Sequence, residues 1–144
     1  MNFKIYFNED EKKKILKSIL KNHNIDQQYY TFLNDIYFDT PGNILKKILV
    51  MSQLEVVPMN KSIDNINFYI ENYINEENPL FLQFACFFIQ KFYYELIFNN
   101  HINLNFYFQN YLRVIKQIHD MKNYNLNKKN VLTSVKETLL NEAR

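Results

Sequence analysis

Histidine and cysteine side chains are the first candidates for metal binding or nucleophilic chemistry in this chain. The sequence holds three histidines, His23, His101 and His119, and one cysteine, Cys86. No histidine has a second ligand three or four residues away on its own predicted helix. Cys86 lies within the apolar run 84–89, which is typical of a buried, unreactive thiol. We therefore expect no metal site, no cofactor and no cysteine nucleophile.

The acidic residues do not form a catalytic pair either. Glu76 and Glu77 stand just before Asn78, where negative charge favours the N-terminus of the next helix. His119 and Asp120 are sequence neighbours, so their side chains point in different directions on a helix. The sequence contains no motif of a phosphate loop, zinc protease, serine hydrolase or EF-hand. These observations predict that the protein is not an enzyme.

Aromatic and basic residues near the C-terminus form the best candidate for nucleic-acid binding. Single-strand-binding proteins stack bases on aromatic rings and hold the backbone with cations. The residues concerned are Tyr107, Tyr111, Arg113, Lys116, Lys128 and Lys129. Both tyrosines fall on or beside the apolar stripe of their predicted helix, which favours core or interface packing. A small helical nucleic-acid-binding or protein-interaction module is the alternative to the function inferred below.

Bulk charge gives little support to nucleic-acid or membrane binding. The 144 residues include 17 basic and 15 acidic side chains, for a net charge of +2. The charge is uneven, because residues 61–100 hold 2 basic and 5 acidic side chains, whereas residues 101–144 hold 7 and 3. Ordinary solvated helix faces account for such a distribution.

Polar residues at predicted helix N-termini organise the chain. Asn8, Thr40, Asn78 and Asn127 can each accept a hydrogen bond from an unpaired backbone N–H, and Thr40 and Asn78 precede a proline suited to the first helical position. Apolar residues at helical spacing then predict about seven helices. Their expected first residues are 9, 27, 41, either 62 or 64, 79, 104 and 128, and the helix that begins at 27 is expected to end near residue 37. Residues 2–7 alternate apolar and polar side chains and predict a short extended segment.

Two small bundles are expected in an all-α fold, over residues 1–55 and 62–144, with the segment 55–60 as linker. The stretch 80–98 is long enough to cross a membrane, but it contains Gln83, Gln90, Lys91 and Glu95. These polar residues favour a central buried helix and no membrane partner. A single cysteine cannot form an internal disulfide, and we expect a cytoplasmic protein. The chain has one glycine, too few for a dinucleotide fingerprint or glycine-dependent β-turns.

Two segments resemble the non-catalytic half of bacterial DNA polymerase III clamp-loader subunits. Residues 40–49, which open on Thr40-Pro41-Gly42, resemble the third helix of the lid subdomain in AAA+ proteins. In that family a glycine-containing turn precedes a helix that often carries an arginine facing the nucleotide. Residues 3–20 are similar to the extended segment and first helix of the lid. Residues 115–132 look like the end of the collar domain, where an asparagine-containing turn introduces the final helix.

The position of the nucleotide-facing arginine is occupied by Leu45, and Lys46 and Lys47 are near it but not aligned. This departure favours the delta-prime class, whose members do not hydrolyse ATP. The resemblance implies an AAA+ lid over 1–55 and a collar over 62–144, in a chain whose ATPase core would precede residue 1. It further implies a structural role in the loader that places the sliding clamp on primed DNA. The partners would be other loader subunits, with DNA contacted only through the complex and no small-molecule substrate.

Overall fold

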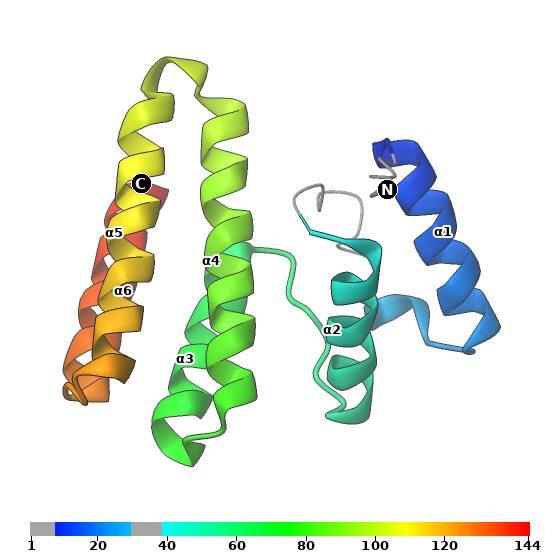
Figure 1. The fold of residues 1–144 in the computed structure, drawn as a ribbon, viewed down its shortest axis with the longest axis horizontal. Coiled ribbons are helices and arrows are strands. Elements are labelled where there is room, and N and C mark those ends of the chain that lie inside the picture. The colour runs from blue at the N-terminus through cyan, green and yellow to red at the C-terminus, as the bar shows by residue number, and fades with distance from the viewer. Residues whose placement is uncertain (1–7, 30–38) are drawn as a thin grey trace, which may run out of the picture. The chain divides into compact units, whose positions relative to one another are not determined.

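The computed structural model describes residues 8–29 and 39–144, and the regular elements in these ranges are all helical. They are α1 (Glu9–Asn22), η1 (Gln27–Tyr29), α2 (Pro41–Gln53), α3 (Ser62–Glu76), α4 (Pro79–Asn99), η3 (His101–Asn103), α5 (Leu104–Asn123) and α6 (Lys128–Ala143), where η marks a 3-10 helix (Figure 1). The all-α prediction is confirmed. The extended segment expected at 2–7, and residues 30–37 of the second expected helix, lie outside the described residues.

The chain divides into two compact units, residues 1–58 and 59–144. In the first unit α1 and α2 pack together. Their buried side chains are Leu16 and Leu20 from α1 and Ile44, Ile48 and Met51 from α2, which recur at the spacing of one helix face. The second unit holds α3, α4, α5 and α6.

All four predicted N-terminal caps are present. Asn8 forms a reciprocal capping box with Glu11, in which Asn8 Oδ1 accepts from the Glu11 N–H at 2.8 Å. Thr40, Asn78 and Asn127 each accept a backbone N–H from the first turn of their helices. These bonds satisfy donors that would otherwise lack a partner, so each helix begins where its cap stands.

Helix α3 begins at Ser62 by a different device, because its capping position, Lys61, makes no side-chain bond. The buried Asn65 reaches back instead. Its Nδ2 donates to Met59 O at 2.9 Å and to Lys61 O at 3.2 Å, and its Oδ1 accepts from Met59 N at 2.8 Å. One side chain therefore fixes both the entry of the chain and the start of α3.

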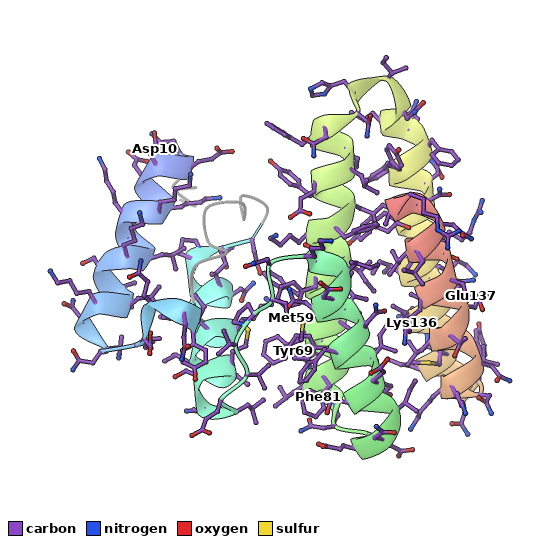
Figure 2. The ribbon with its side chains drawn as sticks, turned by 180° about the vertical axis from the view of Figure 1, so that it is seen from behind. Asp10, Met59, Tyr69, Phe81, Lys136 and Glu137 are labelled. Carbon is purple, nitrogen blue, oxygen red and sulfur yellow. The ribbon has the colours of Figure 1, made fainter. Side chains whose placement is uncertain are left out.

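The second unit is an up-down-up-down arrangement in which α4 packs against both α3 and α5, and α6 packs against α5 and α3. Tyr69 of α3 is buried against three rings of α4, with centroid distances of 6.3 Å to Phe81, 5.1 Å to Phe84 and 5.7 Å to Phe88 (Figure 2). Ten residues of α4 are buried, and they occupy most of its circumference, leaving the side of Gln83 and Gln90 partly or fully exposed. Because each large apolar side chain stabilises the fold by about 1.5–3 kcal/mol when fully buried, α4 dominates the core.

Among the described helices, α4 alone is long and apolar enough to cross a membrane by length and composition. In the structure, 56% of that stretch is buried by other parts of the protein. This burial agrees with the expected central helix of a water-soluble bundle.

Non-glycine residues hold the left-handed positions that end the helices. Asn24, Glu55, Glu77 and Asn125 all have φ between 51° and 56°. At the end of α2, Glu55 N donates to Ser52 O at 3.2 Å and Val56 N donates to Met51 O at 3.0 Å, which is the Schellman pattern. Glycine adopts this conformation without a steric cost, whereas Glu55 does not.

We therefore expect Glu55→Gly to raise the free energy of unfolding of the first unit by about 0.5–1 kcal/mol. The control is Lys46→Gly, which places glycine inside α2 and should lower the same quantity by about 1 kcal/mol. Urea unfolding of the full chain measures both. Destabilisation by Glu55→Gly would contradict the assignment of this left-handed cap.

Candidate functional site

The histidines and the cysteine are not brought together. Among residues 8–29 and 39–144, no three His, Cys, Asp or Glu side chains gather as a possible metal site. His23 and His101 are exposed at the ends of α1 and α4. Burial raises the pKa of the Cys86 thiol, so at neutral pH it is protonated and a poor nucleophile.

The segment that resembles a lid helix is built around Asp39. Its carboxylate accepts from Thr40 N at 2.8 Å, from Asn43 Nδ2 at 3.0 Å and from Lys47 Nζ at 2.8 Å. Burial alone would raise the pKa of Asp39, but these three donors outweigh it and hold the pKa below its ordinary value. The cluster therefore fixes the N-terminus of α2.

Gly42 is not required by the backbone in this segment. It lies in the first turn of α2, its φ is not positive, and a Cβ built on it would meet nothing within 4 Å. Pro41 occupies the first helical position as expected, Leu45 is half-buried, and Lys46 is exposed. The geometry thus gives a structural role to Thr40 and Pro41 and leaves Gly42 and Lys46 without one.

The aromatic pair of α5 lies partly inside the bundle. Tyr111 packs edge-on against the buried Tyr93 of α4, at 5.7 Å between ring centroids, and burial raises the pKa of Tyr111. Tyr107 is half-buried. These contacts are those of core packing, the interpretation that the apolar stripe favoured.

Two of the four candidate cations are held by carboxylates of the same chain. Lys116 Nζ lies 2.8 Å from Asp120, and Lys128 Nζ lies 3.0 Å from Glu77 and 5.6 Å from the centroid of the Tyr73 ring. Arg113 and Lys129 are exposed. The positive charge of residues 101–144 is thus partly matched by the negative charge of α3.

A second pair strengthens this match between α3 and α6. Lys136 Nζ of α6 lies 2.9 Å from Glu71 of α3 (Figure 2 labels Lys136). Together with the Lys128–Glu77 pair, it is consistent with the antiparallel packing of α6 and α3. Part of the uneven charge of the sequence is thus paired within the unit.

A cluster that the sequence did not reveal joins α3 to α4. Lys91 of α4 is buried, and its Nζ donates to Glu95 one turn later and to Ser62 Oγ at 3.3 Å. The Ser62 hydroxyl lies 3.3 Å from both carboxylate oxygens of Glu95. These residues share the side of α4 that meets the first residue of α3.

Serine beside lysine is a pairing used in nucleophilic catalysis, but it requires a neutral lysine that can accept a proton. Here Lys91 Nζ is instead engaged in an ion pair with the Glu95 carboxylate of the same helix. The arrangement satisfies a buried cation and positions the start of α3. These bonds align the first residue of α3 with Lys91 and Glu95 of α4, and they do not activate Ser62.

A second polar cluster joins α4, α5 and α6. Asn110 Nδ2 of α5 donates to Glu142 Oε1 of α6. Burial, and next the neighbouring Glu142 carboxylate, raise the pKa of the Tyr93 hydroxyl. Tyr93 Oη and Glu142 Oε2 are both buried without a hydrogen bond of ordinary geometry. The cluster places the last turn of α6 level with Asn110.

These two clusters mark where α3 begins and where α6 ends, and the α4–α5 hairpin continues beyond both. Figure 1 shows its turn lying past the first residues of α3 and past the C-terminus. We call residues 96–109 the hairpin tip. Its exposed large apolar side chains are Phe98 (65% exposed), Ile102 (98%), Leu104 (46%), Phe106 (60%) and Phe108 (45%).

The hairpin tip is the candidate functional site. Leu104 and Phe108 have the apolar spacing of the helix predicted to begin at residue 104. The structure leaves both partly exposed, whereas Val114, Ile118 and Met121 further along α5 are buried. Comparisons with protein-family models, with curated proteins and with solved structures found no match to this chain.

The Lys91–Glu95 assignment predicts unequal costs for removing its two charges. Glu95→Ala leaves a buried ammonium with one neutral partner and should lower the free energy of unfolding by about 1–3 kcal/mol. Lys91→Met keeps the apolar stem and removes the buried charge, so it should change that quantity by less than about 1 kcal/mol.

Urea unfolding measures both variants, with Glu76→Ala on the exposed side of α3 as the control. A larger loss for Lys91→Met than for Glu95→Ala would show that Lys91 has a role other than the one assigned.

Proposed function

We propose that the chain is a non-catalytic assembly module that works by protein–protein contact. The observation that carries this proposal is the hairpin tip, where five large apolar side chains are exposed at one end of the four-helix unit. Large apolar side chains that are exposed together often mark a site that binds a partner.

The specific form of the proposal is the lid and collar portion of a cytoplasmic clamp-loader subunit of the delta-prime class. The resemblance of residues 40–49 and 115–132 supports it, as does the order of a smaller helical unit followed by a larger one. In this role the four-helix unit would join the collar of the loader, and DNA would be reached only through the complex. The ion pairs that occupy Lys116 and Lys128 agree with a module that does not itself grip nucleic acid.

Size-exclusion chromatography with light scattering tests the specific form. The full chain is mixed with the remaining clamp-loader subunits of the same organism, each added separately and then together. We expect a stoichiometric complex with at least one of them, because collar domains assemble through apolar helix faces. The control partner is the sliding clamp without the loader. Failure of every loader subunit to co-elute with the chain would refute the clamp-loader role.

A further inference from the structure

The hairpin tip has a second property that narrows the choice of partner. Between Glu95 and Arg113 the chain contains no Asp, Glu, Lys or Arg, so 17 consecutive residues carry only the titratable groups of His101, Tyr107 and Tyr111. The polar residues there are mainly asparagines, which both donate and accept hydrogen bonds. Such a surface offers nothing to a charged partner and meets no like-charge repulsion from a copy of itself.

The tip is also structurally incomplete. Below Glu95 and Asn110, the α4–α5 hairpin is completed by α3 and α6 to form a four-helix unit. Beyond those residues the end of α6 lines a shallow pocket with Phe106 and Tyr107. Phe98, Ile102 and Phe106 of the hairpin tip remain 60% exposed or more. Two such hairpins packed about a two-fold axis would make a four-helix arrangement.

The exposed area suits such a contact. Aromatic side chains present roughly 150–250 Å² each, so the exposed parts of Phe98, Ile102, Leu104, Phe106 and Phe108 give on the order of 600 Å² per copy. Two copies would then bury at most about 1,200 Å² in total, which is the lower end of specific protein interfaces. A contact of this size is expected to be reversible, with a dissociation constant on the order of micromolar.

We propose that the hairpin tip binds the same tip of a second copy of this chain, about a two-fold axis near Ile102. The proposal rests on the assembly role and names the partner of its surface. Ile102 lies at the apex of the turn with 98% of its surface exposed, so both copies bring it to the contact while neither needs it to fold. Phe98 and Phe106 lie on the helices that flank it and form the sides of the interface.

Sedimentation of the full chain over a range of concentrations tests this proposal. We expect the wild type to pass from monomer to dimer, and Ile102→Lys to raise the dissociation constant by at least about tenfold, because two copies then oppose like charges. The matched control is Tyr124→Lys, a substitution of a 72% exposed residue at the opposite end of α5. It should leave the dissociation constant unchanged.

Charge complementation supplies the second measurement. Ile102→Lys mixed with Ile102→Glu should restore the dimer if the same residue meets itself across a two-fold axis. A wild type that stays monomeric at about 100 µM, well above the expected constant, would overturn the proposal. A dimer that Ile102→Lys leaves intact would also overturn the proposal. A monomer that sediments with phosphatidylcholine vesicles would overturn it as well.

The two proposals fail separately. If the chain is monomeric but co-elutes with a loader subunit, the assembly role is supported and the proposal of a second copy as partner is refuted. If the chain dimerises through Ile102 but binds no loader subunit, the contact between hairpin tips is supported and the clamp-loader role is refuted.

Discussion

Helix α4 has apolar side chains on almost every side, and the need to cover them determines how the second unit is built. The ring of Tyr69 from α3 packs along one side, and α5 covers another through Tyr111 against Tyr93. The two charged residues of α4, Lys91 and Glu95, meet the first residue of α3. Past that level the same apolar character continues without cover, and the hairpin tip is the result.

The sequence predicted the helices well, because their signals are local. Caps at Asn8, Thr40, Asn78 and Asn127 need only the first helical turn, and all four form as expected. The start of α3 was less predictable, since it depends on Asn65 reaching back to Met59. Gly42 is the single glycine of the chain, yet the left-handed positions that favour glycine hold Asn24, Glu55, Glu77 and Asn125. The position of Gly42 therefore does not identify a functional site. The resemblance to clamp-loader subunits stays a prediction.

The candidate site could not be read from the sequence, because it depends on helix lengths in three dimensions. Leu104 and Phe108 have the spacing of core residues, yet they are 46% and 45% exposed, and the Asn110–Glu142 bond that joins α5 to α6 spans 32 positions of sequence. Likewise, Lys91 and Glu95 served in the sequence as evidence against a membrane span, whereas their bonds to Ser62 appear only when α3 and α4 pack. Non-local contacts thus decide which part of a continuous apolar pattern becomes core and which becomes surface.

Amide hydrogen exchange on the dilute full chain tests the central claim, that the four-helix unit ends at the two polar clusters and the hairpin tip extends beyond it. We expect the slowest exchange within residues 82–93, a sharp loss of protection between Glu95 and Asn110, and a return of protection from Val114 onward, because helix turns without covering contacts open locally. Uniform slow exchange from residue 82 through residue 118 in the monomer would contradict this account, since it would mean that the tip is already covered within the chain.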